Sequence, residues 1–160
     1  MKLAILVLED EPEVRMALER DLEEFARTVR IEPAGDVADA REVMAEVAAD
    51  GDLLAVVLAD HRLPGETGVD LLVEVAKDPA TRHVATVLVT GQADQQDTIR
   101  AVNEAGLDHY VAKPWDPDDL RSIIRRLLTE VVERHGLDPL PHLPALDQVR
   151  AMELVRVRPD

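Results

Sequence analysis

Hydrophobic and polar positions follow two alternating patterns along this chain of 160 residues. Continuous apolar runs at 3–8 and 53–59 are typical of strands that other layers cover on both faces, and 84–89 is expected to form a further strand. Weaker runs at 29–33 and 109–112 predict two more short strands, the first with the character of an edge strand. Between the runs, apolar residues recur every three or four positions, which indicates amphipathic helices. Five strands alternating with five helices predict an α/β protein with a doubly wound parallel sheet.

Residues that favour helix starts give the expected helix boundaries. Pro12 opens the first helix, because proline suits the first helical turn, and the helical pattern continues to Phe25. Thr67 and Asp70 have the spacing of a capping box and start the third helix. A more polar fourth helix is expected over 94–104.

We expect the chain to divide into a main domain at 1–134 and a C-terminal extension at 135–160. Asp116 is the expected N-cap of the last helix of the main domain. The proline-rich segment 137–141 breaks that helix and is typical of a linker, whereas 145–156 can form a short helix. The extension could be partly disordered, or it could dock on the main domain or on a dimer partner. The chain could also be a fragment of a longer protein, with the extension as the start of a linker.

The composition is that of a folded, acidic protein, with 46% hydrophobic residues and a formal net charge of −15. Such an acidic excess repels nucleic-acid phosphates and anionic membrane surfaces, so we expect no nucleic acid and no membrane as direct partners. No apolar run approaches the roughly 18 residues of a membrane span, and the run after Lys2 is too short for a signal sequence. These features favour a cytoplasmic protein. The absence of cysteine excludes disulfides, thiolate metal sites and cysteine nucleophiles.

Residues suited to phosphoryl chemistry stand at the ends of four predicted strands. They are Glu9 with Asp10, Asp60, Thr90 and Lys113. The carboxyl ends of parallel strands lie along one edge, where open α/β sheets bind ligands, so these side chains should meet in one crevice. Three carboxylates at close range repel one another unless a cation neutralises them, and oxygen ligands with open positions favour Mg²⁺. The pattern therefore predicts a magnesium-dependent phosphoryl-transfer site.

Elimination narrows the choice of nucleophile at this site. The sole serine, Ser122, lies inside the last predicted helix, and the five histidines show neither metal-ligand nor triad spacing. Asp60, at the end of the most buried predicted strand, is the natural acceptor for an acyl phosphate. The ammonium of Lys113 could pair with the transferred group, and the Thr90 hydroxyl could donate a hydrogen bond to it.

Together, these segments resemble the receiver domain of two-component response regulators, over about residues 2–134. Each segment alone is a weak signal, but their order and their places after successive predicted strands are specific. The matching segments are LVLEDEP at 6–12, DHRLPG at 60–65 with Gly68, TG at 90–91 and YVAKPW at 110–115. This sequence departs from the usual receiver pattern at three positions: Glu9 stands where aspartate is commoner, Leu63 replaces methionine, and Trp115 replaces phenylalanine.

The resemblance implies a flavodoxin-like fold with strand order 2-1-3-4-5 and a set of site roles. Asp60 would take a phosphoryl group from the phosphohistidine of a sensor histidine kinase or a phosphotransfer protein. Asp10, Asp60 and the backbone carbonyl of Arg62 would hold Mg²⁺, with Glu9 acting largely through water. Thr90 and Lys113 would contact the phosphoryl oxygens, and Thr90 with Tyr110 would form a switch.

Three functional classes stay open. The first is a phosphorylated signalling module that switches contacts with a downstream protein partner. For this class we expect no DNA-binding output in this chain and no separate enzymatic turnover. The second is an adaptor of receiver fold that is never phosphorylated. The third, a phosphohydrolase, is disfavoured because such enzymes need an acid two residues after the nucleophile, where Arg62 stands here. The chain could also be the N-terminal receiver of a larger protein with a non-DNA-binding output, and it could form a homodimer.

Overall fold

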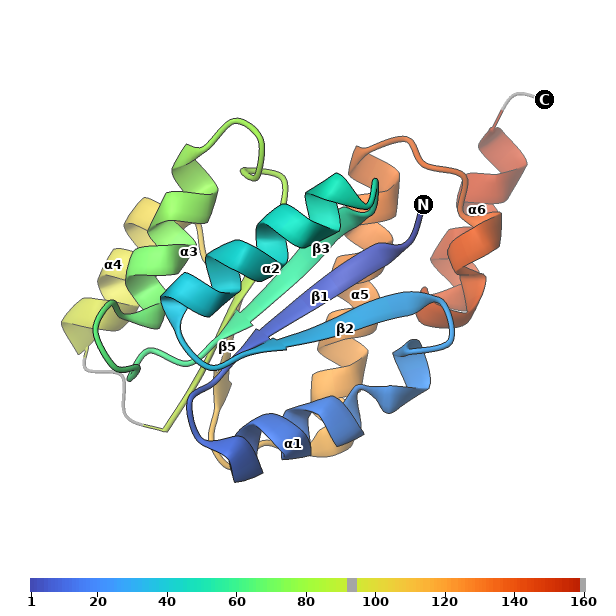
Figure 1. Ribbon diagram of the computed structural model, residues 1–160. Helices are drawn as coiled ribbons and strands as arrows, with labels where there is room; N and C mark the ends of the chain where they lie inside the picture. Colours follow the sequence, from blue (N-terminus) through green and yellow to red (C-terminus); the bar gives the residue numbers. More distant parts are fainter. Residues whose placement is uncertain (92–94, 159–160) are drawn as a thin grey trace.

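The computed structural model of the chain describes residues 1–91 and 95–158, and its centre is a parallel sheet of five strands (Figure 1). The strands lie in the order β2-β1-β3-β4-β5, which confirms the predicted flavodoxin-like arrangement. Their bounds are β1 Leu3–Leu8, β2 Val29–Ala34, β3 Leu53–Ala59, β4 Ala85–Thr90 and β5 His109–Ala112. All the strand pairs in the sheet are parallel, so the carboxyl ends of the strands share one edge.

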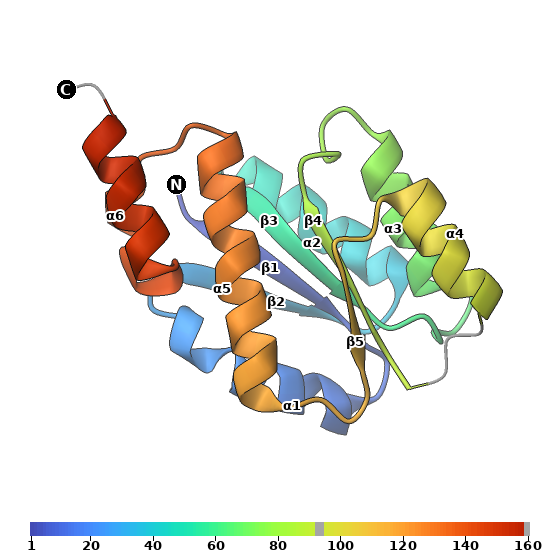
Figure 2. The same cartoon turned by 180° about the vertical axis from the view of Figure 1, so that it is seen from behind.

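Helices cover both faces of the sheet (Figures 1 and 2). One hydrophobic cluster contains residues of α1 and α5, and the other contains residues of α2, α3 and α4. The helix bounds are α1 Pro12–Asp21, α2 Val37–Ala49, α3 Gly68–Lys77, α4 Gln95–Ala105 and α5 Pro117–Arg134. Among the described residues, no helix has both the length and the apolar character that crossing a membrane requires.

The central strand β1 shows why the sheet needs cover on both sides. Leu3, Ile5 and Val7 belong to one hydrophobic cluster, while Ala4, Leu6 and Leu8 belong to the other. Side chains of a strand alternate between the faces of a sheet, so a continuous apolar run buries both faces. Burying each of the large aliphatic side chains contributes roughly 2 kcal/mol relative to leaving it exposed.

The observed helix boundaries agree with the prediction where the sequence contains a capping signal. They differ from the prediction where it rested on hydrophobic periodicity alone. The capping box is present, with the Asp70 amide donating to Thr67 Oγ1 and the Thr67 amide donating to Asp70 Oδ2, both at 3.1 Å. The helical pattern that we expected to reach Phe25 is interrupted, because α1 ends at Asp21 and a short 3₁₀ helix, η1 (Glu23–Phe25), follows. The first residue of the fourth predicted helix, Asp94, lies outside the described residues.

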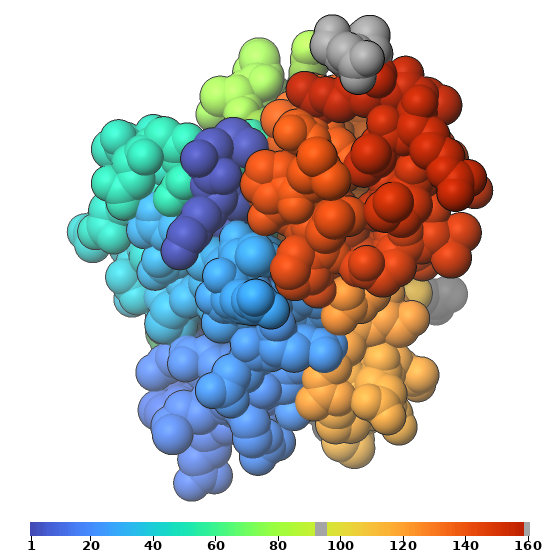
Figure 3. Space-filling view, turned by 90° about the vertical axis from the view of Figure 1, so that its right-hand side faces the viewer, coloured from blue at the N-terminus to red at the C-terminus, as the bar shows by residue number. Residues whose placement is uncertain are grey.

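The C-terminal extension is folded against α5. It contains the 3₁₀ helix η2 (Leu140–Ala145) and α6 (Gln148–Val157). Figure 3 shows it, in red, beside the blue segment that holds η1 and β2. Leu146 and Ala151 join the hydrophobic cluster of the α1–α5 face, and the Thr129 hydroxyl of α5 accepts a hydrogen bond from the Asp147 amide at 2.8 Å. The expected division into 1–134 and 135–160 stays a prediction.

Candidate functional site

The ends of β1, β3 and β5 bring three predicted site residues into direct contact. Lys113 Nζ lies 2.9 Å from Glu9 Oε2 and 3.0 Å from Asp60 Oδ2. Glu9 is fully buried and Asp60 is only 6% exposed. The pairing of β1 with β3 sets this geometry, because Leu8 faces Ala59 and the next residue along each strand carries the carboxylate. A single ammonium therefore bridges two buried carboxylates from neighbouring strands.

Asp10 completes an acidic cluster at this edge. One carboxylate oxygen from each of Glu9, Asp10 and Asp60 lies within 4.8 Å of the others. Three carboxylates against the single ammonium of Lys113 leave two negative charges when all are ionised. Oxygen-only ligands of this charge suit a hard divalent cation such as Mg²⁺, so the donor set fits the predicted ion.

Burial and like charge govern the titration of Glu9. Burial raises the pKa of Glu9 from 4.5 to about 7, the Lys113 hydrogen bond opposes that rise, and the nearby Asp60 charge adds to it. For Lys113, burial lowers the pKa, but the hydrogen bonds to Glu9 and Asp60 outweigh burial and raise the pKa above its usual value. The ammonium thus stays charged, whereas without a further cation Glu9 is readily protonated near neutral pH.

Backbone contacts hold the two acidic loops in place. Arg15 Nη1 in α1 donates to the Glu9 carbonyl at 2.9 Å, and the Arg62 amide faces Asp60 Oδ1 at 3.4 Å. A Cβ added to Gly68 would lie 1.8 Å from the Asp60 carbonyl oxygen, so only glycine allows α3 to begin this close to Asp60. Gly68 belongs to the predicted motif, but the reason for a glycine there becomes visible only in the structure.

Thr90 and Tyr110 lie on the two neighbouring strands β4 and β5. Thr90 is 2% exposed at the end of β4, and Tyr110 is 37% exposed. The Tyr110 hydroxyl donates to the Thr90 carbonyl at 3.2 Å, so the ring is already attached to the β4 strand. The roles expected for the Thr90 hydroxyl and for the Arg62 carbonyl stay predictions.

Two contacts near the site were not predicted. His61 Nε2 lies 3.0 Å from Asp97 Oδ2 of α4, which ties the residue after Asp60 to that helix. Trp115 Nε1 donates to Asp21 Oδ2 at 2.8 Å, although the sequence suggested only an apolar role for this ring. Both contacts join segments far apart in the chain, and no short motif signals them.

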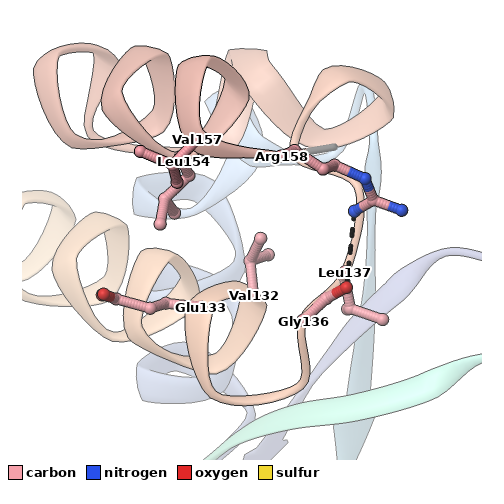
Figure 4. Close-up of a pocket in the computed structure, with 7 residues that line it drawn as sticks. All are labelled: Val132, Glu133, Gly136, Leu137, Leu154, Val157 and Arg158. Carbon is pink, nitrogen blue, oxygen red and sulfur yellow. Dashed lines mark hydrogen bonds between the residues drawn. The ribbon is translucent and has the colours of Figure 1, made fainter. Parts of the chain in front are cut away.

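A separate cavity of about 410 Å³ lies between the end of α5 and α6 (Figure 4). Within it, Arg158 Nη1 donates to the Gly136 carbonyl at 3.3 Å. Its lining is Val132, Glu133, Gly136, Leu137, Leu154, Val157 and Arg158. None of these residues belongs to the acidic cluster, so this cavity is not the predicted site.

Sequence comparison gives a consistent match. The family described as "Response regulator receiver domain" matches residues 5–125. The hydrogenase transcriptional regulatory protein HoxA of Cupriavidus necator is 32% identical over 154 residues, covering 96% of this chain and 29% of HoxA. The transcriptional regulatory protein AruR of Pseudomonas aeruginosa is 36% identical over 132 residues, covering 82% of this chain and 51% of AruR. The chain thus spans about a third to a half of the length of these relatives.

Solved structures show the same fold. A CheY-like response regulator receiver domain protein from Methanospirillum hungatei has a TM-score of 0.70 at 25% identity, covering 84% of this chain and 99% of that one. The signal receiver domain of an HD domain-containing protein from Pseudomonas fluorescens has a TM-score of 0.74 at 21% identity, covering 84% of this chain and 93% of that one. The second likeness supports the fold alone.

Proposed function

This chain belongs to the response regulator receiver domain family, and we propose that its Asp60 accepts a phosphoryl group from a sensor histidine kinase or a phosphotransfer protein. Phosphoryl acceptance is the role of the family; the residues and the partner are the content of the proposal. The observation that carries it is the Lys113 ammonium, 2.9 Å from Glu9 and 3.0 Å from Asp60, at the carboxyl edge of a parallel sheet.

The transfer step follows from the groups at this edge. A carboxylate oxygen of Asp60 attacks the phosphorus atom of a phosphoimidazole, an O–P bond forms, and the N–P bond breaks. The departing imidazole nitrogen takes up a proton, and Asp60 becomes an acyl phosphate. Lys113 already contacts Asp60, so its ammonium can follow the new phosphoryl oxygens at short range.

Magnesium would be held by the acidic cluster of Glu9, Asp10 and Asp60, with the Arg62 carbonyl as a further expected ligand. When bound, it supplies positive charge that stabilises the phosphoryl oxygens during transfer. The chain's own contribution is to collect the ligands: the adjacent pair Glu9 and Asp10 directly follows β1, and Asp60 directly follows β3.

The output is proposed to be a change of protein contacts on the α4–β5–α5 face. Ile99 and Val102 of α4 are 49% and 53% exposed, and Tyr110 of β5 is 37% exposed. Phosphorylation adds nearly two negative charges at Asp60. Thr90 would then move toward the phosphoryl group, and Tyr110 would turn inward into the vacated space. A downstream protein partner that binds these apolar side chains would sense the change.

The relatives bear on the output only indirectly. HoxA and AruR are named transcriptional regulatory proteins, and this chain spans 29% and 51% of their lengths. Both relatives extend well beyond the part that this chain matches, so their printed names do not give this chain an output. Our expectation that this chain itself binds no nucleic acid rests on its net charge of −15 and stays a prediction.

Mass spectrometry after incubation with acetyl phosphate and Mg²⁺ tests the central claim. We expect one phosphate adduct on the wild-type chain and none on Asp60→Asn. Asp36→Asn is the matched control, because asparagine caps helices as well as aspartate and Asp36 is the N-cap of α2. An unlabelled wild-type chain would contradict the proposal and favour the unphosphorylated adaptor.

Solution NMR with beryllofluoride, a phosphoryl mimic, tests the switch. We expect amide shifts concentrated over residues 94–128, with Tyr110 among them. A spectrum that changes only around Asp60 would overturn the switch while leaving phosphoryl acceptance intact.

A further inference from the structure

A buried hydrogen bond outside the acidic cluster joins α1 to the segment that follows β5. Asp21, the last residue of α1, is 4% exposed. Its Oδ2 accepts the indole N–H of Trp115 at 2.8 Å, and its carbonyl accepts Arg121 Nε of α5 at 2.9 Å. The Arg121 guanidinium also lies 3.9 Å from Asp21 Oδ1, which balances part of the buried charge.

Trp115 comes two residues after Lys113, where the sheet no longer holds the chain. The Lys113 amide makes a long hydrogen bond to the Thr90 carbonyl at 3.3 Å, close to the end of the β4–β5 ladder. Helix α5 begins only after its N-cap Asp116. The indole hydrogen bond therefore anchors the short stretch between the strand and the helix, and Lys113 lies in that stretch.

The same helix also holds the opposite side of the site. Arg15 of α1 donates to the Glu9 carbonyl at 2.9 Å, and Asp21 at the far end of α1 holds Trp115. A helix is a stiff element, so these two contacts set the spacing between the Glu9 loop and the Lys113 segment. Lys113 must reach both Glu9 and Asp60 to make its contacts of 2.9 and 3.0 Å.

We propose that Asp21 and Trp115 are positioning residues for phosphoryl transfer: their hydrogen bond keeps the Lys113 ammonium between Glu9 and Asp60. This inference rests on the proposed function. A phenylalanine at this position has no N–H and could not make this contact. The device therefore depends on the particular residues of this chain.

Trp115→Phe is the sharpest variant, because it removes the donor and keeps an aromatic ring, although a smaller one. We expect its rate of labelling by acetyl phosphate to fall roughly tenfold, since displacing a reacting group by about 1 Å can cost about 100-fold. Asp21→Leu, which removes the acceptor, should also slow labelling, and the double variant with Trp115→Phe should lose less than the sum of the two single-variant losses. Thr129→Val, which removes a buried hydrogen bond between α5 and the extension, should label at the wild-type rate.

Epistasis with Lys113 separates positioning from a merely structural role. In a Lys113→Met background, Trp115→Phe should cause no further loss of labelling rate. A tenfold loss that persists there, or a Trp115→Phe variant that labels at the wild-type rate, would overturn the inference.

A second measurement does not depend on phosphorylation. Trp115 is the sole tryptophan, so its indole N–H gives one assignable NMR signal. Lys113→Met should shift that signal, and Thr129→Val should leave it in place. If the wild-type chain is never labelled, the proposed function is contradicted, but the positioning role can still be tested. An indole signal that does not shift in Lys113→Met would overturn the positioning role in either case.

Discussion

Lys113 and Glu9 are 104 residues apart in the sequence, yet Lys113 Nζ lies 2.9 Å from Glu9 Oε2. The Glu9 side chain meets the ammonium that also contacts Asp60. Glu9 thus shares Lys113 with the predicted phosphoacceptor before any phosphoryl group arrives. This sharing makes the charge state of the cluster measurable through stability and metal affinity.

Removing the shared ammonium should destabilise the fold. Lys113→Met leaves the buried carboxylates of Glu9 and Asp60 without their cation, and an uncompensated buried charge is costly. We expect a loss of about 2 kcal/mol in the free energy of unfolding near neutral pH, measured by urea denaturation. Mg²⁺ should restore stability more in this variant than in the wild type, because it can neutralise the freed carboxylates.

The exposed Lys77 of α3 offers the control for that experiment. Lys77→Met removes the same charge and should change stability by less than about 0.5 kcal/mol. Equal effects of the two substitutions would mean that net charge, rather than the bridge to Glu9 and Asp60, determines the result.

Glu9 should make stability fall as pH rises from about 4.5 to about 7. In this window the folded protein keeps the Glu9 proton while the unfolded chain releases it, so deprotonation favours unfolding. Glu9→Gln removes the titration and keeps an oxygen that can accept from Lys113. We expect the free energy of unfolding of Glu9→Gln to exceed that of the wild type by about 2 kcal/mol near pH 8. Near pH 5 the two values should differ little. Glu11→Gln, at an exposed neighbour, should show no such divergence in urea denaturation.

The same carboxylate should make magnesium affinity depend on pH. Mg²⁺ must displace the Glu9 proton, so its affinity should rise with pH up to about 7 and then level off. Isothermal titration calorimetry at several pH values measures this rise. Glu9→Gln should remove most of it, whereas an unchanged pH profile in that variant would exclude Glu9 as the titrating group.

The sequence predicted the site's main contacts because they follow from strand order. Once β1, β3 and β5 are parallel members of one sheet, Glu9, Asp60 and Lys113 must lie at one edge. The bounds of β1 and β3 were equally predictable, since 3–8 and 53–59 are continuous apolar runs with polar ends, and the weaker run at 109–112 also matches β5.

The remaining features depend on side chains that meet across elements. The bond between Asp21 and Trp115 needs the packing of α1 beside α5, which no local pattern contains. Leu22 and Phe25 continue the spacing of α1 through a 3₁₀ turn, so periodicity could not locate the helix end. The docking of the extension through Leu146 was one of several open alternatives, because a short amphipathic segment does not specify its partner.

Gly68 should tolerate no side chain. A Cβ at this position would lie 1.8 Å from the Asp60 carbonyl oxygen, which is backbone and cannot rotate away. We expect Gly68→Ala to cost about 3 kcal/mol in urea denaturation and to slow acetyl phosphate labelling, because α3 must shift away from Asp60. In Gly35→Ala the nearest contact is an ordinary 3.5 Å to Arg15 Nη1, so that control should change stability by less than about 1 kcal/mol. A fully stable Gly68→Ala would mean that the loop after Asp60 relaxes freely.

His142 should make the docked extension sensitive to acid. It is 4% exposed in η2, and burial lowers its pKa below 6.5, with Asp138 opposing the shift. Above about pH 6.5 the imidazole is neutral in both the folded and the unfolded state, so unfolding changes no proton binding at this residue. As the pH falls below that value, the unfolded chain binds a proton that the buried imidazole resists, so stability declines. His83, which packs against His135, has its pKa lowered by burial in the same direction and adds to the decline.

His142→Leu should reduce that decline while keeping an apolar filling for the site. We expect the gap in unfolding free energy between the variant and the wild type to widen by about 1 kcal/mol from pH 8 to pH 5.5. Amide hydrogen exchange should place the acid-induced opening in η2 and α6, because these elements contact the rest of the protein mainly through α5 and η1. Opening that begins instead in the strands would mean that the extension unfolds only together with the sheet, and His142 would then act on the whole domain.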